Sequence, residues 1–420
     1  MSTNVLKTSP APILDALKGM ENPHRRKVFD AGAHFTDAKI DGADIDLEYA
    51  LKFLFGYNGS TATFNAYRRE IERLLQWSWR VERRSAHRLA REDIEDFVRF
   101  TLAPPAAWIG ERHAPRFVTR DGERRAHPHW RPFVASVSKV EAKAGRKPNA
   151  RTYSPSQSAV RATFTALSSF YDFLTEESVI NLNPVALIRQ KSKFIRRDQN
   201  AAVVRRISNL QWDYVIETAE MMAAENPDED ERTLFIMNCL FALYLRISEL
   251  VADERSAPVM GDFRKDQDGN WWFHVTGKGN KDRTITVSDA MLSALKRYRE
   301  ALGLPPLPAI NEQTPLIAKA RGVGPVTSTR QIRRIVQSCF DAAFERMKDD
   351  GLEIDAMELR AATVHWLRHT GISEDVKIRP REHVRDDAGH ASMATTDRYI
   401  ESDRRERHAS ARKKPLRDLD

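Results

Sequence analysis

The stretch from Thr363 to Ile400 reads TVHWLRHTGISEDVKIRPREHVRDDAGHASMATTDRYI and carries a distinctive set of polar groups. His365 and Arg368 lie three positions apart, so a helix places both side chains on one face. The dipeptide Gly389-His390 follows, and then Tyr399. Cations, imidazoles and one phenol, with no carboxylate pair or thiol among them, suit a site that holds a phosphodiester and attacks it with the tyrosine oxygen.

This order of residues resembles the active-site motif of the tyrosine recombinases, the phage integrase family. Two upstream segments extend the resemblance. Arg246 lies in LRISEL, which is similar to the family's Arg-x-Ser-Glu-Leu segment, and Lys278 lies in GKGNKDR, which is similar to its lysine-bearing hairpin. One such match is a weak signal, whereas five matches in the family's order are a strong one. The resemblance covers residues 47–102 and 154–402.

The resemblance implies a role for each of these groups in DNA cleavage. Tyr399 is expected to attack the scissile phosphate and become linked to the DNA 3′ end, while Lys278 protonates the departing 5′ oxygen. Lys281 is the alternative to Lys278 as this acid. A phenol with a pKa of about 10 is a poor nucleophile at pH 7 unless its proton is taken. His365 can take or help to take that proton, and His390 can donate to a nonbridging oxygen.

Arginines supply the charge stabilisation in this scheme. Arg246 and Arg368 can each offer a planar fork of N–H donors to phosphate oxygens. No Asp/Glu cluster accompanies them, so the sequence predicts a site that uses no metal ion and no cofactor. Taken alone, Arg246 fits better as a capping or salt-bridged arginine with Glu249 as its partner. The predicted catalytic residues are Arg246, Lys278, His365, Arg368, His390 and Tyr399.

The chain departs from the family pattern in three places. Tyr244 stands where the family usually has Gly, two residues before Arg246, and tyrosine does not easily adopt a positive φ, which predicts a differently built turn. Asp387 and Ala388 stand where the family usually has two leucines. An acid there either opposes phosphate binding or pairs with Arg385. The segment 104–153 has no counterpart in the family.

Composition and charge bound the class of protein. The 420 residues are 41% hydrophobic, enough for more than one cored domain, and 67 basic against 59 acidic residues favour a polyanionic partner such as DNA, RNA or an anionic membrane surface. No apolar run approaches the roughly 20 residues that span a bilayer, and the amino terminus lacks a signal-peptide core. We therefore expect a cytoplasmic, nucleoid-associated protein. Cys239 and Cys339 are predicted to be core thiols rather than disulfide or zinc ligands.

Hydrophobic periodicity predicts a mostly α fold, with a small β-hairpin or sheet in the catalytic domain. The resemblance implies a two-domain DNA clamp, made of a helical core-binding domain and an integrase-type catalytic domain. The predicted segments are an N-terminal arm 1–41, a core-binding DNA domain 42–188 with a basic insertion 104–153, a linker 189–206, a catalytic domain 207–402 and a C-terminal tail 403–420.

Two basic regions of the first domain are open to more than one interpretation. One is a set of arginines on a predicted helix, namely Arg68, Arg69, Arg73 and Arg80. Taken singly, each of them fits a solvated helix surface better than a contact with the DNA backbone. The other is the insertion 104–153, with eleven Lys/Arg against four acids. Its interleaved aromatics fit a nucleic-acid groove and ordinary surface cover equally well. These aromatics are Trp108, Phe117, Trp130 and Phe133.

Taken together, the sequence predicts a site-specific DNA recombinase, an integrase or resolvase of a mobile element. By resemblance it acts as a homotetramer on two sites in double-stranded DNA, with room for accessory DNA-bending proteins and no membrane partner. A type IB-like topoisomerase, which relaxes supercoils as a monomer, is the alternative with the same chemistry. A DNA-binding protein that has lost catalysis is the alternative from another class, and retention of all six predicted catalytic residues argues against it.

Overall fold

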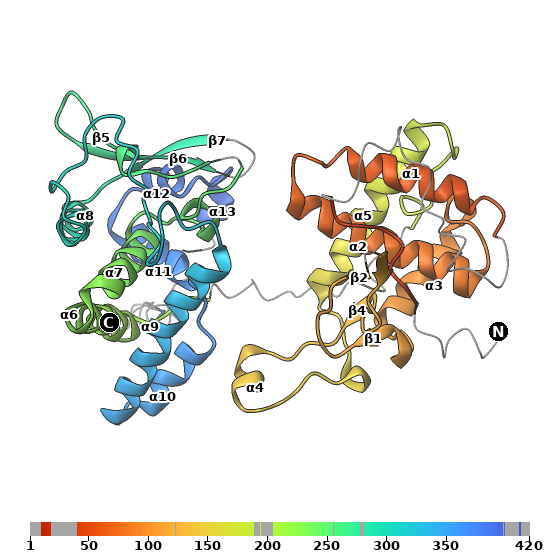
Figure 1. Ribbon diagram of the computed structural model, residues 1–420, viewed down its shortest axis with the longest axis horizontal. Coiled ribbons are helices and arrows are strands. Elements are labelled where there is room, and N and C mark those ends of the chain that lie inside the picture. The colour runs from red at the N-terminus through yellow and green to blue at the C-terminus, as the bar shows by residue number, and fades with distance from the viewer. Residues whose placement is uncertain are drawn as a thin grey trace, which may run out of the picture. The chain divides into compact units, whose positions relative to one another are not determined.

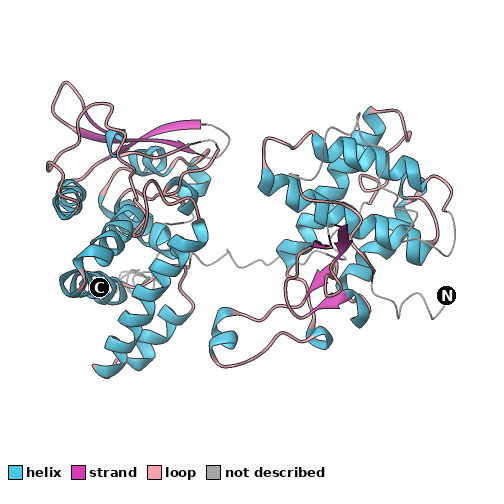
Figure 2. Ribbon diagram, in the orientation of Figure 1, coloured by secondary structure: helices cyan, strands magenta, loops and turns pink. Residues whose placement is uncertain are grey.

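The computed structural model divides into two compact units, residues 1–199 (unit 1) and 200–420 (unit 2), which are described separately. Helices dominate both units and the strands are short (Figure 2), which confirms the predicted mostly helical fold. The predicted linker and C-terminal tail lie almost wholly outside the described residues, as does the N-terminal arm apart from residues 10–17 and 40–41. The structure describes residues 10–17, 40–121, 123–188, 194, 205–254, 256–277, 281–397, 399 and 411–412.

Unit 1 is built on four amphipathic helices that share one apolar core. The hydroxyl of Ser60 accepts a hydrogen bond from the Thr63 N–H and caps the second helix, and Ser156 caps the fourth in the same way through Ala159. The helices are α1 Ala43–Phe55, α2 Thr61–Trp77, α3 Arg91–Leu102 and α5 Gln157–Glu176, with a π-helical extension of α2 at Ser78–Glu82 and a 3₁₀ turn at Ala86–Arg88.

The insertion 104–153 forms small sheets and turns rather than an extended loop. Strand β1 pairs with β4 in parallel, and β2 pairs with β3 in an antiparallel hairpin. The elements are β1 Ile109–Gly110, β2 Phe117–Arg120, β3 Glu123–Ala126, β4 Phe133–Val134 and α4 Lys139–Lys143, with 3₁₀ turns at Ala106–Trp108 and Ala150–Thr152.

Aromatic residues of the insertion pack into the interior of unit 1. Trp108 and Phe133 are 0% and 1% exposed, and Trp130 is also buried. The ring of Trp108 meets that of Phe100 on α3 edge-to-face, with 5.0 Å between the ring centroids. Rings held in this way are not free to stack on bases, and Trp108 and Phe133 form a small apolar cluster that packs against Phe100. Phe117 and Trp130 instead line a pocket between α2 and the insertion.

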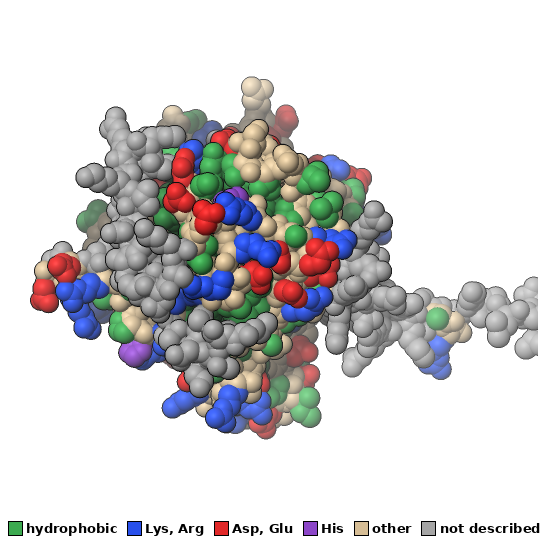
Figure 3. Space-filling model, turned by 90° about the vertical axis from the view of Figure 1, so that its right-hand side faces the viewer, with side chains coloured by type: hydrophobic (Ala, Val, Ile, Leu, Met, Phe, Trp, Pro, Cys, Tyr) green, Lys and Arg blue, Asp and Glu red, His purple; other side chains and the backbone are tan. Residues whose placement is uncertain are grey.

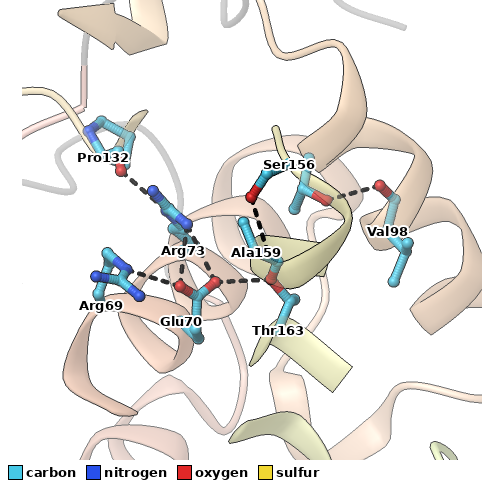
Figure 4. Close-up of polar contacts among 9 residues, drawn as sticks. Arg69, Glu70, Arg73, Val98, Pro132, Ser156, Ala159 and Thr163 are labelled. Carbon is cyan, nitrogen blue, oxygen red and sulfur yellow. Dashed lines mark hydrogen bonds and ion pairs between the residues drawn. The ribbon is translucent and has the colours of Figure 1, made fainter. Parts of the chain in front are cut away.

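The arginines of α2 bind within unit 1 (Figure 4). Glu70, which is buried, accepts hydrogen bonds from Arg69 at 2.7 Å, from Arg73 at 3.1 Å and from the Thr163 hydroxyl on α5 at 3.0 Å. Although burial opposes ionisation, Arg73 and Arg69 lower the pKa of Glu70. Arg73 also donates to the carbonyl oxygen of Pro132 in the insertion at 2.9 Å. Neither a solvated surface nor a DNA contact describes Arg73, whose role is to join α2 to the insertion.

A second buried carboxylate attaches residues 10–17 to the same helix. Glu72 accepts hydrogen bonds from the backbone N–H groups of Ile13 at 2.6 Å and Leu14 at 2.9 Å, and it forms an ion pair with Arg116 of the insertion. Arg68, 9% exposed, donates to the carbonyl oxygen of Asp15. Arg68, Arg73 and Arg116 thus bind partners within unit 1. The face drawn in Figure 3 accordingly shows Lys/Arg and Asp/Glu side chains intermingled instead of one uniform basic patch.

The burial of Trp108 predicts that the insertion contributes to the stability of unit 1. Trp108→Ala should lower the free energy of unfolding by about 3–5 kcal/mol, because it removes a fully buried ring and leaves a cavity. Chemical denaturation followed by circular dichroism measures this loss. Val140→Ala in the exposed helix α4 is the matched control and should stay within about 0.5 kcal/mol of the wild type. Equal midpoints for the Trp108 variant and the wild type would contradict the role given to the insertion.

Unit 2 packs helices against each other and beside a three-stranded antiparallel sheet in the order β5-β6-β7 (Figure 1). Helix α12 packs against β7 at the edge of that sheet. The strands are β5 Phe263–Lys265, β6 Trp271–Gly277 and β7 Lys281–Thr286. The helices are α6 Asn209–Glu225, α7 Pro227–Ala242, α8 Asp289–Ala301, α9 Thr329–Asp349, α10 Glu353–Ala356, α11 Val364–Ile378, α12 Arg381–Ala388 and α13 Met393–Asp397, with 3₁₀ turns at Ile247–Glu249, Met260–Asp262 and Met357–Arg360.

Helices α7 and α11 cross closely enough to exclude a side chain. A Cβ atom at Gly371 would lie 2.1 Å from the carbonyl oxygen of Phe241, so only glycine fits there. Cys239 on α7 and Cys339 on α9 are fully buried free thiols, as predicted from their apolar surroundings. Among the described residues, no helix combines the length and apolar character needed to span a lipid bilayer.

Candidate active site

Tyr399 follows α13 and is held against two histidine rings. Its side chain is 8% exposed, and its ring stacks on that of His390 with 5.5 Å between centroids and an interplanar angle of 16°. The ring of His369 lies 5.1 Å from the same tyrosine. The Nδ1 atom of His390 is 2.9 Å from the hydroxyl of Thr396 on α13. The predicted nucleophile and one of the predicted imidazoles therefore lie side by side.

Helix α11 brings a third imidazole to this cluster. His365 is exposed on the first turn of the helix, and its ring meets that of His369 edge-to-face at 4.1 Å. His369 was not among the predicted residues, although its place four positions after His365 on a helix would have indicated that the two rings meet. The Nδ1 atom of His369 is buried and has no hydrogen-bond partner among the described residues.

Arg368, on the same helix as His365 and His369, lies in the interior. The residue is only 3% exposed. Its two terminal nitrogens donate hydrogen bonds to the carbonyl oxygens of Tyr244 and Ala388. Burial first, and then the positive charges of Arg246 and Arg283, lower the pKa of Arg368 to about 10, so it remains a cation at pH 7. Both of these partners are backbone atoms, so the fold fixes the orientation of the guanidinium, and in the described part of the chain no acid forms an ion pair with it.

Arg246 shares a buried glutamate with a second arginine. Its guanidinium lies 3.0 Å from Glu249, and its backbone N–H donates to the other oxygen of that carboxylate at 2.8 Å. The capping and salt-bridged arrangement considered for Arg246 is therefore present. Arg283 on β7 donates to both oxygens of Glu249, at 2.8 and 2.9 Å. One carboxylate between two guanidinium groups leaves a net positive charge, and the Arg246 side chain keeps 33% of its surface exposed.

The turn before Arg246 keeps a positive φ despite the tyrosine. Tyr244 has φ of +49°, so the prediction of a differently built turn was wrong. A second glycine is required after α12, where Gly389 has φ of +62° and a Cβ atom would lie 2.7 Å from the Arg283 side chain. This close approach places His390 immediately beside the arginine on β7.

Asp387 does not pair with Arg385, as one of the two predictions for it had proposed. Arg385 pairs with its neighbour Asp386 at 2.7 Å on the surface. Asp387 is 4% exposed and accepts a hydrogen bond of 2.6 Å from Arg379. Its charge is thus paired inside the fold.

The predicted general acid lies outside the described residues. Strand β6 ends at Gly277, which pairs with Lys281, the first residue of β7. Lys278 is not among the described residues. The side chain of Lys281 is outside the described part as well. The other five predicted residues lie in unit 2, where the pKa of His390 is affected by Arg368 and Arg246 and that of His365 by the same two arginines.

The imidazoles are held neutral at physiological pH. Burial and the neighbouring positive charges lower the pKa of His369 and of His390 from 6.5 to about 4, and they lower the pKa of His365 as well. The unfolded chain binds protons at His369 and His390 below about pH 6.5, whereas the folded protein does so only near pH 4. The folded state therefore loses stability as the pH falls from about 6.5 to about 4.

Removing two of these rings should make the protein less sensitive to acid. Between pH 7 and pH 4.5, His369→Gln/His390→Gln should lose roughly 1–3 kcal/mol less unfolding free energy than the wild type. Denaturant titrations at each pH measure the difference. His383→Gln, at an exposed position of α12, is the control and should follow the wild-type curve. Parallel curves for the double variant and the wild type would mean that these imidazoles do not titrate as described.

The chain is similar in sequence and in structure to known recombinases. No protein-family model matches the chain. It is 24% identical over 257 residues to tyrosine recombinase XerC of Chlorobaculum parvum, covering 57% of this chain and 68% of that one. It is 27% identical over 268 residues to tyrosine recombinase XerC of Thermodesulfovibrio yellowstonii, covering 59% and 72%. A solved structure of XerH site-specific recombinase, bound to a palindromic difH substrate after cleavage, aligns with a TM-score of 0.54 at 13% identity over 90% of this chain and 92% of that one.

The mostly helical two-unit fold is thus similar to that of XerH site-specific recombinase. The two relatives are named tyrosine recombinases, the family that the motif formed by His365, Arg368, Gly389-His390 and Tyr399 resembles, and the chain is similar to them over more than half of its length.

Proposed function

We propose that this chain is a site-specific recombinase that cuts and rejoins double-stranded DNA through a covalent 3′-phosphotyrosine. The observation that carries the proposal is the ring of Tyr399, packed against two neutral imidazoles and close enough to the buried cation Arg368 for the two groups to interact electrostatically. A tyrosine beside uncompensated positive charge suits in-line attack on a phosphodiester, because the cations stabilise charge on the nonbridging oxygens.

Each described group has a task in this reaction. Arg368 and Arg246 bind the nonbridging oxygens of the scissile phosphate, and the partial exposure of Arg246 lets DNA reach it. A neutral imidazole can accept the phenolic proton as the tyrosine oxygen attacks, a role we assign to His365, acting through its contact with His369. If Thr396 donates to Nδ1 of His390, the tautomer leaves Nε2–H as a donor to the phosphate.

The covalent intermediate makes rejoining independent of an external energy source. The Tyr399–phosphate ester conserves the energy of the broken phosphodiester, so attack by a DNA 5′ hydroxyl can reseal the strand without ATP. Lys278 is the proposed donor of the proton to the 5′ oxygen when the strand is first cut. No step in this scheme requires a metal ion or an organic cofactor.

The proposal extends to the assembly and its setting. Recombination joins two duplexes, and we propose that four copies of this chain act together on two DNA sites, within the cytoplasm and at the nucleoid. An integrase or resolvase of a mobile element is the proposed biological role. The XerH structure to which this fold is similar contains a DNA substrate, which supports double-stranded DNA as the partner.

A plasmid assay separates this function from its alternatives. Two copies of the DNA that flanks the gene, placed in one supercoiled plasmid, should yield deletion or inversion products with the purified wild-type protein. A plasmid without the flanking DNA is the control and should keep its topology. Relaxation of both plasmids without recombinant products would instead indicate a type IB-like topoisomerase. DNA binding with neither product would indicate a protein that has lost catalysis.

A further inference from the structure

Two of the residues that depart from the family pattern, Tyr244 and Asp387, contact the same arginine. Arg379, which follows α11, lies 3.1 Å from the hydroxyl of Tyr244 and 3.0 Å from the carboxylate of Asp375. The Tyr244 hydroxyl also donates to Asp375. The second terminal nitrogen of Arg379 donates to Asp387 at 2.6 Å. One side chain thus joins the turn before Arg246 to helix α12.

The buried carboxylate of Asp387 continues this network to the sheet. Its Oδ1 atom accepts hydrogen bonds from the backbone N–H of Thr286 at 3.1 Å and from the Thr286 hydroxyl at 3.2 Å. Its backbone carbonyl accepts from Nε of Arg283 at 3.2 Å. Charged and polar partners therefore meet both oxygens of Asp387, which is the condition for keeping an ionised acid in the interior. Arg379 and the donors on β7 already bind the Asp387 carboxylate, so Asp387 does not oppose the binding of a phosphate.

Both ends of the network are adjacent to the atoms that hold Arg368. The guanidinium of Arg368 donates to the carbonyl oxygens of Tyr244 and Ala388, and Ala388 follows Asp387 directly. Tyr244 is held at a positive φ, a conformation that persists for a non-glycine residue only when its surroundings fix it. The hydrogen bonds of its hydroxyl to Asp375 and Arg379 supply such fixing. Movement of either carbonyl would reorient the arginine.

We propose that Arg379 is a positioning residue: by binding Tyr244 and Asp387 together, it fixes the two carbonyl oxygens that aim the Arg368 guanidinium at the scissile phosphate. This inference rests on the proposed recombinase function. In this chain Arg379 binds the carboxylates of both Asp375 and Asp387. The network touches the site through backbone atoms, so Arg379 acts through Arg368 and does not itself meet DNA.

The test measures covalent adduct formation in a single turnover on a nicked DNA substrate at saturating concentration. Arg379→Met should slow this step about 10- to 100-fold, while the Kd for DNA stays within about threefold of the wild type. Arg379→Lys, which retains a charge able to reach both acids, should recover part of the rate. Arg385→Met is the matched control, since Arg385 pairs with Asp386 on the surface of the same region, and it should react at the wild-type rate.

A double-mutant cycle asks whether the effect passes through Arg368. In an Arg368→Ala background, the added Arg379→Met change should slow the reaction no further, because the group that it positions is already absent. A merely structural role for Arg379 would instead give losses that multiply. Multiplicative losses, or a wild-type rate for Arg379→Met, would overturn the proposal.

Two further measurements keep the outcomes distinct. Thermal unfolding checks that each variant is folded, and if Arg379→Met is not, Arg379→Met/Asp387→Leu removes the unpaired acid and replaces it in the cycle. Failure of the wild type itself to form an adduct would contradict the proposed function. A reactive wild type together with an equally reactive Arg379→Met would contradict only the positioning role.

Discussion

Tyr399→Phe should bind DNA and yet form no covalent adduct, a loss of at least roughly a thousandfold in the rate of strand cleavage. The change removes one hydroxyl and keeps the ring that packs against His369 and His390. Fold and DNA affinity should therefore be preserved. A nicked substrate, from which the short 5′ fragment diffuses away after cleavage, traps the adduct for detection on a denaturing gel.

A second tyrosine of unit 2 provides the control for this experiment. The hydroxyl of Tyr214 on α6 donates a hydrogen bond of 2.7 Å to Asp350 on the surface. Tyr214 has no part in the proposed chemistry. Tyr214→Phe should form adduct at the wild-type rate. Adduct at wild-type level from Tyr399→Phe would remove Tyr399 from its role as nucleophile.

Lys278→Ala should slow cleavage about 10²- to 10⁴-fold, the usual contribution of a general acid. An alkoxide leaving group needs a proton, whereas a thiolate, with a pKa of about 8.5 for a cysteine-like thiol, leaves readily without one. A substrate with sulfur in place of the 5′ bridging oxygen should therefore restore cleavage by Lys278→Ala. The same substrate should do much less for Arg246→Ala, whose defect is one of charge stabilisation.

The sulfur substrate also decides between the two lysines of the hairpin. Rescue of Lys281→Ala without rescue of Lys278→Ala would move the assignment to Lys281. Rescue of neither would place the acid elsewhere, with His365 as the next candidate. Single-turnover rates on matched oxygen and sulfur substrates give each comparison directly.

The shared glutamate gives the cation cluster an internal scaffold. Burial opposes ionisation of Glu249, but Arg283 and Arg246 lower its pKa, so it stays charged between them. Arg246 is thereby held at the surface without full neutralisation, while Arg283 is held against Gly389. Because the single carboxylate of Glu249 binds both arginines, Arg246 can be salt-bridged and still have positive charge available to bind a phosphate.

Local spacing in the sequence determined the elements of unit 2 that carry the site. His365 and Arg368 lie on α11 as their three-residue separation predicted, and the predicted hairpin is formed by β6 and β7. The glycine before His390 is used as a left-handed helix end. These features depend on neighbours a few residues apart, which periodicity and turn chemistry record directly. The order of the motifs was likewise enough to predict the family.

Partners across the fold were decided by tertiary structure alone. Asp387 meets Arg379 instead of Arg385, Tyr244 has a positive φ, and Trp108 and Phe133 of the insertion are buried in a cluster beside α3. Nothing in the local pattern distinguishes an arginine that faces DNA from one that binds a buried glutamate, as Arg73 does. The choice depends on which groups other segments bring within about 3 Å of it, and on the cost of leaving a buried charge unpaired. The sequence by itself therefore predicted a set of site residues, whereas the packing of α11, α12 and β7 decided what holds the described ones in place.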